Sequence, residues 1–159
     1  MQTVTECGQW RLGRRVLPQH TDHAGVMWHG AYLAWLEEAR VEALAAVGLA
    51  YSELSARGLE LPVVELTIRY LQPLRHGDVV EVISRVLPRQ GLKLCWSSQF
   101  ITGEGAAERL AAEARVELVL VDRSGEGSAP VEGVPAFRLR RRWPEDLAAA
   151  ATALAQGQG

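Results

Sequence analysis

The chain has 159 residues, of which 48% are hydrophobic and 23% are charged, and its formal net charge at pH 7 is −2. Chains of this length and composition fold as one globular domain with a sizeable core, so we expect a single domain over residues 1–159. The slightly negative charge argues against a nucleic-acid-binding surface. No apolar run is long enough to span a membrane.

The sequence contains two cysteines, Cys7 and Cys95, which are too few for a disulfide framework. Cys95 lies in a strand-like run, where a cysteine is normally a small buried side chain. The N-terminus lacks the basic and apolar pattern of a signal peptide. These features together predict a cytoplasmic protein.

The first predicted strand covers residues 9–17 and is stopped by Pro18. Apolar residues then recur with the spacing of one α-helical face, and Gly48 is a natural stop for this helix. The members of the apolar face are Tyr32, Trp35, Leu36, Ala39, Ala43 and Val47. Its aromatic residues indicate that the helix is buried against a sheet.

Residues 51–58 are typical of a short helical turn or loop, and four strands are predicted after them. These strands share an alternation of apolar and polar residues and cover residues 61–70, 78–87, 93–102 and 110–121. Consecutive strands with short connections favour an antiparallel meander, and one long helix on it gives an α+β layer fold. The core should span residues 10–121, and residues 122–159 should be an extension that ends in a short, frayed helix.

The turn before the long helix carries a dense group of titratable side chains. Asp22 and the histidines His20, His23 and His29 surround Gly25. A helix start offers free backbone N–H groups and the positive end of the helix dipole, where an oxyanion is stabilised. Acidic and basic groups beside such a turn are typical of a hydrolytic site.

A specific motif begins at Asp22 and reads Asp-x-Ala-Gly-Val-Met-Trp-His, followed by Tyr32, Trp35, Glu37 and Arg40. This motif resembles that of the 4-hydroxybenzoyl-CoA thioesterase type of hotdog-fold acyl-CoA thioesterases. The resemblance covers roughly residues 10–121. It implies a hotdog fold, in which an antiparallel sheet of about five strands wraps around one long central helix, and a homodimer or homotetramer.

A second segment, residues 70–78, is similar to the turn between strands in this family, with His76 at its second aromatic position. Three positions depart from the family pattern. His20 replaces a usually acidic residue, His23 replaces a common Ala or Pro, and Ala31 stands where Asn is frequent. None of the three removes the position that matches the catalytic carboxylate.

The resemblance implies that Asp22 is the catalytic carboxylate, acting either as general base on water or as a nucleophile that forms a mixed anhydride. Backbone N–H groups of Trp28 and His29 would hold the thioester oxygen. The His29 ring would polarise the carbonyl or protonate the leaving thiolate. The substrate-binding positions near this site would be Gly25, Val26, Tyr32 and Trp35.

Arg89 and Lys93 flank a glycine turn between two predicted strands, where members of this family often meet the CoA nucleotide. Cations at such a turn suit phosphates, although a solvated turn with scattered charge would look the same. A denser basic run, 138–142, is interpreted either as a solvated face or as an anion-binding segment.

Each site residue also has a structural interpretation. A carboxylate at the position of Asp22 can simply cap the turn. His29 can be a half-buried core histidine, and His20 and His23 exposed turn residues. Glu37 and Arg40, at i and i+3, favour a structural ion pair.

The sequence therefore predicts a cytoplasmic acyl-CoA thioesterase that needs no cofactor and no metal. Its substrate would be an aromatic acyl-CoA, hydroxybenzoyl- or dihydroxynaphthoyl-like, or a short- or medium-chain acyl-CoA, and acyl carrier protein remains open as the carrier. The alternatives are a hotdog dehydratase or hydratase and a non-catalytic acyl-CoA-binding module. A metal hydrolase is disfavoured because the histidines lack the i, i+4 spacing of common zinc sites.

Overall fold

The structure is a computed structural model that describes residues 8–89, 91–123 and 137–157. Cys7 lies outside the described residues. The elements, in chain order, are β1 (Trp10–Arg15), η1 (Pro18–His20), α1 (His29–Ala46), α2 (Tyr51–Ala56), β2 (Leu59–Glu60), β3 (Val63–Tyr70), β4 (Val79–Val86), β5 (Lys93–Thr102), η2 (Gly105–Ala107), β6 (Arg109–Val119), β7 (Val121–Asp122), β8 (Arg138–Leu139) and α3 (Glu145–Gln156).

The main sheet has five strands in the order β1-β4-β5-β6-β3, and every pairing in it is antiparallel. The predicted α+β fold with one five-stranded antiparallel sheet is confirmed. The predicted meander is correct only for β4, β5 and β6. Strand β3 pairs with β6 rather than with β4 and lies at the opposite edge from β1.

Strands β5 and β6 lie between β3 and β4 in the sheet, so the connection from β3 to β4, residues 71–78, must cross the ends of both. It must pass the ends of β6 and β5, a lateral distance of about 14 Å at the usual strand spacing. Eight extended residues can span up to about 26 Å, so the connection is long enough. It therefore runs across the end of the sheet beside the start of α1, which proves important for the site.

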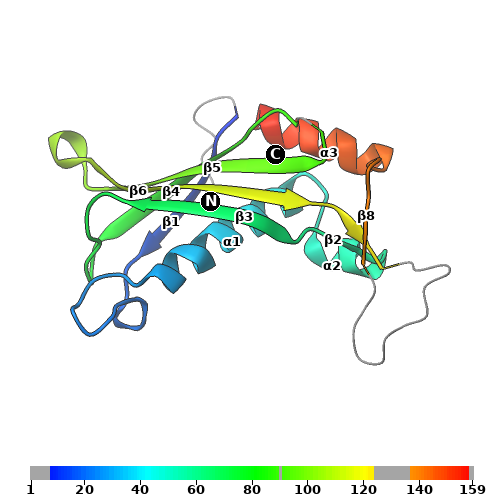
Figure 1. Ribbon diagram of the computed structural model, residues 1–159. Coiled ribbons are helices and arrows are strands. Elements are labelled where there is room, and N and C mark those ends of the chain that lie inside the picture. The colour runs from blue at the N-terminus through cyan, green and yellow to red at the C-terminus, as the bar shows by residue number, and fades with distance from the viewer. Residues whose placement is uncertain (1–7, 90, 124–136, 158–159) are drawn as a thin grey trace.

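Helix α1 lies against one face of the sheet (Figure 1), and its predicted apolar face is buried. Tyr32, Trp35, Leu36, Ala39 and Ala43 all belong to the core. Alternating residues of the central strands complete this core, among them Val80, Val82, Leu94, Trp96, Phe100, Val116 and Leu118. Burial of these apolar side chains is the main stabilising term of the fold.

The C-terminal segment is ordered by packing, contrary to the predicted fraying of its helix. Leu147 and Leu154 of α3 are fully buried, and α3 packs against β4 and α1. The indole of Trp10 donates a hydrogen bond to the Leu154 carbonyl at 3.0 Å. The alanine-rich composition suggested a weak helix, but a helical spacing gives it one buried face, formed by Leu147, Ala150, Ala151 and Leu154.

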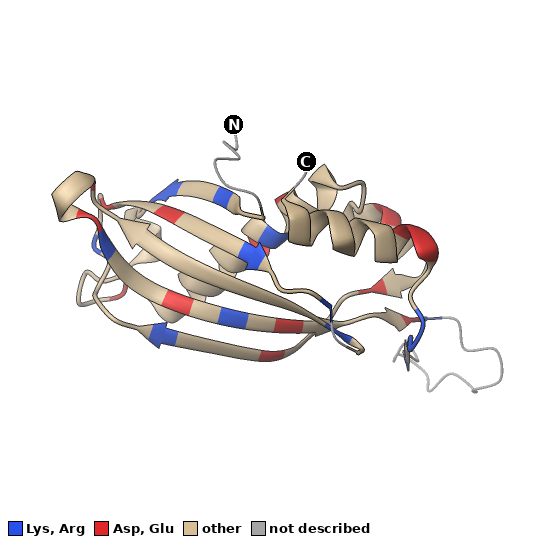
Figure 2. Cartoon of the chain, turned by 90° about the horizontal axis from the view of Figure 1, so that it is seen from above, with Lys and Arg blue, Asp and Glu red and all other residues tan. Residues whose placement is uncertain are grey.

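A second sheet of three short strands, β2-β7-β8, continues β3 and β6 at the end of the molecule that also holds α2 (Figure 1). Seen from above, acidic and basic residues alternate along the strands (Figure 2). The outer face of the sheet therefore carries no large field of one sign. In the described part of the chain, no helix is both long and apolar enough to cross a membrane.

Candidate active site

The turn that follows η1 is closed by backbone hydrogen bonds across Gly25. The Asp22 N–H donates to the Val26 carbonyl at 2.9 Å, and the Gly25 N–H donates to the Asp22 carbonyl at 3.0 Å. Gly25 has a φ of 77°, which lies in the left-handed region that glycine adopts without steric cost. The turn centred on Gly25 was predicted, and its backbone shows why glycine stands there.

The two carboxylate oxygens of Asp22 have different surroundings. Oδ1 accepts hydrogen bonds from the Ala24 N–H at 2.8 Å and from the Val26 N–H at 3.3 Å. Among the described residues, none bonds to Oδ2. The capping role and an acid–base role therefore do not compete, because one oxygen caps the turn and the other remains available.

The start of α1 provides backbone donors, but not all of the predicted ones. The Trp28 N–H donates to the His20 carbonyl at 3.0 Å, so the prediction that it holds an oxyanion is wrong. The N–H groups of His29 and Gly30 belong to the first turn of α1 and have no acceptor within the described parts of the chain. The donors at the positive end of this 18-residue helix are thus His29 and Gly30.

Gly30 was not among the predicted site residues. A glycine stands at this position because the Trp28 side chain leaves no room for a Cβ. A Cβ added to Gly30 would collide with the Trp28 ring, which folds back over this glycine. The Trp28 ring, 44% exposed, also makes an edge contact with the His29 ring at 5.2 Å between centroids. The His-Gly pair at the helix start was the available sequence signal.

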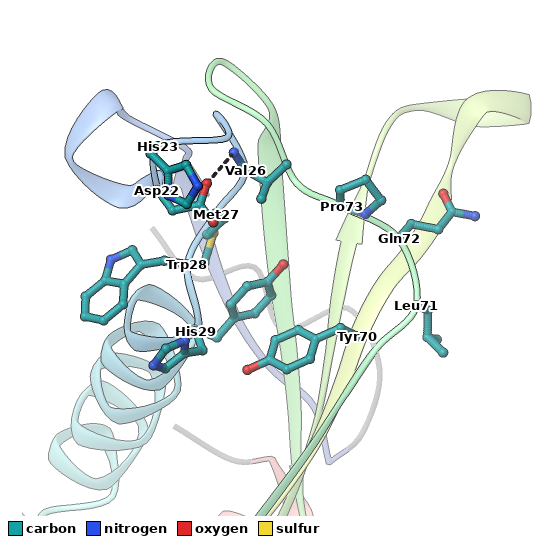
Figure 3. A pocket seen from close by; sticks show the side chains of 11 residues that line it. Asp22, His23, Val26, Met27, Trp28, His29, Tyr70, Leu71, Gln72 and Pro73 are labelled. Atoms are coloured by element: carbon teal, nitrogen blue, oxygen red, sulfur yellow. Dashed lines mark hydrogen bonds between the residues drawn. The ribbon is translucent and has the colours of Figure 1, made fainter.

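A pocket of about 590 Å³ opens between the Asp22 turn, the start of α1 and the loop after β3 (Figure 3). In this view the Tyr70 side chain points from the end of β3 toward His29. Of the predicted site residues, the pocket brings together Asp22, Val26, Trp28, His29 and Tyr32. The other lining residues are His23, Met27, Tyr70, Leu71, Gln72 and Pro73.

The floor of the pocket is aromatic. Tyr32, 2% exposed, makes edge contacts with Tyr70 and Phe100 at centroid distances of 5.1 and 5.0 Å. Burial raises the pKa of Tyr32 to about 12, the nearby Tyr70 adds to the rise, and the positive charge of Arg109 opposes it. At neutral pH the Tyr32 hydroxyl is therefore a protonated hydrogen-bond donor at the pocket floor.

Two predicted binding residues lie outside this pocket. Gly25 shapes the turn without lining the cavity. Trp35 is 3% exposed and contacts the His20 ring at 5.3 Å, so it supports the turn from behind. Nδ1 of His20 accepts a hydrogen bond from the Leu17 N–H at 3.0 Å, which makes His20 a structural residue of η1.

Arg89 and Lys93 lie at the other end of the sheet. Lys93 begins β5, and the pocket floor is reached only at Phe100, about 23 Å along the strand. The Lys93 ammonium bonds to Glu117 at 2.8 Å, and the guanidinium of Arg89 lies 4.6 Å from the centroid of the Trp143 ring. Within one chain neither cation joins the pocket.

The basic run near the C-terminus is partly neutralised. Arg140 forms an ion pair with Asp122 at 2.7 Å. Around it, Arg57 pairs with Asp146 at 2.7 Å and Arg123 lies 3.3 Å from Glu60. Within the run itself, Arg138, Arg141 and Arg142 are exposed, which agrees with the interpretation of the run as a solvated face.

The structure also bears on the expected ion pair between Glu37 and Arg40 and on the grouping of possible metal ligands. Arg40 is buried whereas Glu37 is exposed, and in the described structure no ion pair joins them, so that prediction was wrong. No three His, Cys, Asp or Glu side chains of the described residues are grouped so as to hold a metal ion.

The chain is also similar in sequence to a known family of proteins. The sequence model of a family described as the thioesterase-like superfamily matches residues 16–151. The chain is 41% identical over 108 residues to sll0410 of Synechocystis sp., a candidate esterase by name. That match covers 65% of this chain and 64% of the relative, so the chain spans just under two thirds of that relative's length.

Two other known proteins are similar to this chain over a larger share of their own length. Identity to the acyl-CoA thioester hydrolase YbgC of Escherichia coli O6:H1 is 31% over 108 residues, which covers 68% of this chain and 78% of YbgC. The structure of Slr0204 from Synechocystis, a 1,4-dihydroxy-2-naphthoyl-CoA thioesterase, superposes with a TM-score of 0.72 at 23% identity and covers 92% of this chain and 98% of that one. The latter shows that the hotdog fold is shared.

Proposed function

Because the chain belongs to the thioesterase-like superfamily, we propose that it is a thioester hydrolase that converts acyl-CoA to the free acid and CoA. The observation that carries this proposal is the pocket that joins Asp22 to the start of α1. It combines a carboxylate oxygen and two helix-start N–H groups that have no hydrogen-bond partner among the described residues. Thioester hydrolysis requires both a base and an oxyanion site.

In the general-base route, Asp22 removes a proton from water while the water oxygen adds to the thioester carbon. The negative charge moves to the carbonyl oxygen, where the N–H groups of His29 and Gly30 stabilise it. Collapse of this intermediate breaks the C–S bond and releases the CoA thiolate, which takes up the proton held by Asp22 or one from the His29 ring. In the nucleophilic route, the Asp22 carboxylate adds to the thioester carbon and the C–S bond breaks, so that CoA leaves as the thiolate and an anhydride with Asp22 remains. Water then hydrolyses this anhydride to the free acid and regenerates Asp22, and the thiolate takes up the proton that is released. Neither route requires a metal or a cofactor.

The acyl group suited to this pocket is aromatic or a short to medium aliphatic chain. The walls and floor include Trp28, Tyr32 and Tyr70, whose rings offer edge and face contacts to another ring. The Tyr32 hydroxyl can hydrogen-bond to a ring hydroxyl of a hydroxybenzoyl- or dihydroxynaphthoyl-like group. The name of Slr0204 refers to a substrate of this kind.

Thiol release tests this proposal, with a thiol-reactive dye and a panel of aromatic and aliphatic acyl-CoA esters in the presence of EDTA. We expect turnover of at least one class, and loss of it in Asp22→Asn. Acyl groups on acyl carrier protein belong in the same panel, to decide between the two carriers. Tight binding of acyl-CoA without turnover would instead identify a binding module, and water addition to an enoyl ester would identify a hydratase.

We further propose that the chain forms a homodimer, or a homotetramer built from it, through the exposed edge strand β3. This strand ends the sheet, and its residues are exposed on both faces except for Ile68, which is partly buried. Val64 is 51% exposed and Tyr70 is 54% exposed. An apolar edge strand of this length normally pairs with another strand or is covered, and a second copy would do both.

Light scattering of Val64→Lys tests the interface, because a lysine at a sheet edge opposes pairing. Val79→Lys is the matched control, since Val79 is equally exposed but lies on the interior strand β4. A monomeric parent protein at micromolar concentration with full activity would contradict the proposed dimer.

The dimer would also give Arg89 and Lys93 a role. Antiparallel pairing of two β3 strands would bring the start of β3 in one copy beside Tyr70 of the other. Lys93 lies on β5, two strands in from β3, so it would be about 10 Å from the start of β3 and about 14 Å from Tyr70 of the second copy. Cations there suit the phosphates of CoA, and a CoA ester as substrate implies a cytoplasmic enzyme.

A further inference from the structure

The loop after β3 forms one wall of the pocket, and one guanidinium group bridges its two ends. Backbone hydrogen bonds to Ala111 and Val16 also anchor these ends. Nη1 of Arg109 donates to the Gln72 side chain and to the Pro73 carbonyl, both at 3.2 Å, and Nη2 donates to Oδ2 of Asp78 at 3.4 Å. Arg109 starts β6, far from this loop in sequence. One arginine thus contacts both ends of the segment between Gln72 and Asp78.

The residues bracketed by these contacts are the ones that pair with the Asp22 turn. The Met27 N–H donates to the Leu74 carbonyl at 2.8 Å, and Val26 forms an isolated antiparallel bridge with Arg75. The Arg75 N–H in turn donates to Oδ2 of Asp78 at 2.9 Å. Hydrogen bonds therefore join Arg109 to Asp78 and Asp78 to Arg75, and the neighbour of Arg75, Leu74, is hydrogen-bonded to Met27 beside Val26.

Val26 connects these contacts to the carboxylate. Its N–H donates to Oδ1 of Asp22 at 3.3 Å, and its carbonyl accepts from the Asp22 N–H at 2.9 Å. A displacement of Val26 and Met27 would shift Asp22 relative to the N–H groups at the start of α1. A misplacement of about 1 Å between reacting groups can cost about 100-fold in rate.

We propose that Arg109 is a positioning residue for thioester hydrolysis: it holds Leu74 and Arg75 in place so that they align the Asp22 turn with the start of α1. This inference rests on the proposed function and adds a residue to it. The arginine contacts three acceptors on one loop, a geometry that lysine cannot reproduce. The guanidinium is about two-thirds buried, which limits its screening by solvent.

Steady-state kinetics of Arg109→Gln and Arg109→Lys test the proposal. We expect kcat to fall about 10- to 100-fold in Arg109→Gln, with KM changed less than about threefold, and an intermediate loss in Arg109→Lys. Arg115→Gln is the matched control, because Arg115 lies on the same strand and its hydrogen bonds among the described residues go to Cys95 and Glu117. A kcat of Arg109→Gln within about threefold of the control overturns the proposal; if that variant does not fold, Arg109→Lys decides by the same criterion.

A double-mutant cycle with Asp22→Asn tests whether Arg109 affects turnover through Asp22 or independently of it. Because Arg109 acts through Asp22, adding Arg109→Gln to Asp22→Asn should lower kcat by less than about twofold. A loss as large as in the parent background would mean that Arg109 acts independently of Asp22, and would overturn the assignment.

Amide hydrogen exchange supplies a readout that does not depend on turnover. The Met27 amide should exchange at least about fivefold faster in Arg109→Gln than in Arg115→Gln, since its acceptor Leu74 is released. Equal exchange in the two variants contradicts the proposal. If no thioester is hydrolysed by the parent, the proposed function fails while the exchange result still decides whether Arg109 holds the turn.

Discussion

The pocket lies between two turns that use an aspartate in similar ways, and their difference separates structure from chemistry. In the turn at 75–78, Oδ2 of Asp78 accepts from the Arg75 N–H and also faces the guanidinium of Arg109. In the turn at 22–26, Oδ1 of Asp22 accepts two N–H groups, but none of the described cations forms an ion pair with the carboxylate. Only Asp22 lines the pocket.

Hydrogen bonding of an aspartate to its own turn therefore does not identify its role. Both carboxylates cap a turn, as many aspartates do. What distinguishes them is the second contact, a guanidinium for Asp78 and the open pocket for Asp22. We therefore interpret Asp78 as a residue that holds the loop and Asp22 as the residue that reacts.

The largest expected effect is the loss of turnover in Asp22→Asn. The amide oxygen can still accept from Ala24 and Val26, so the melting temperature should change by less than about 2 °C. The reactive oxygen becomes an NH₂ group, and kcat should fall about 10²- to 10⁴-fold. Steady-state thiol release and a thermal melt of the same preparation check both parts. A kcat within about tenfold of the parent at unchanged stability would indicate a cap alone.

A smaller effect than for Asp22→Asn is expected for Gly30→Ala, which tests the helix start opposite Asp22. The new Cβ would collide with the Trp28 ring, which must then move away from the two N–H groups and from His29. Loss of one oxyanion donor costs about 10²- to 10³-fold, and displacement of the ring should cost less, about 10-fold in kcat. Ala34→Gly, at an exposed position of the same helix, controls for the altered helix propensity.

A smaller change in activity and a larger one in stability are expected for Asp78→Asn. The amide keeps the cap on Arg75 but loses the charge opposite Arg109, a partly exposed pair. We expect the free energy of unfolding to fall by about 0.5–1 kcal/mol and kcat by less than about tenfold. Urea denaturation and thiol release, measured side by side with Asp22→Asn, check this prediction. If the roles of the two aspartates were exchanged, Asp78→Asn would lose more turnover and Asp22→Asn more stability.

The smallest effect on stability at neutral pH is expected for Tyr32→Phe at the pocket floor. Because the pKa of Tyr32 is raised from 10.0 to about 12, the folded state keeps a proton that the unfolded state releases between these values. The contribution is complete below pH 10 and declines as the pH rises toward 12, by up to about 3 kcal/mol. Tyr32→Phe should remove this decline, which urea denaturation at pH 9, 10 and 11 would detect.

The Asp22 turn could be predicted because its determinants are local. Gly25, the carboxylate and the helix start follow one another in the sequence, and the apolar spacing of α1 is regular. The assignment of the Trp28 N–H failed because its acceptor, the His20 carbonyl, is brought close by the bridge between Thr21 and Met27. That pairing depends on the conformation of the turn rather than on residue types.

The opposite wall of the pocket could not be derived from local patterns. Tyr70, Gln72 and Pro73 reach the Asp22 turn only because β3 pairs with β6 at the far edge of the sheet. Alternation predicts a strand but not its neighbour, and a meander would have placed this loop elsewhere. The exposure of β3 has the same origin, since the described chain has no layer that covers its edge.

The ratio of kcat in Asp22→Asn to kcat in Asp78→Asn tests the central claim most directly. It should be measured on one acyl-CoA substrate that the parent hydrolyses, at a temperature where both variants are fully folded. The two changes are chemically identical, so general effects of an amide for a carboxylate cancel. We predict that Asp22→Asn is at least about 10-fold slower than Asp78→Asn; equal rates, or a slower Asp78→Asn, would contradict the assignment of Asp22 as the reactive carboxylate.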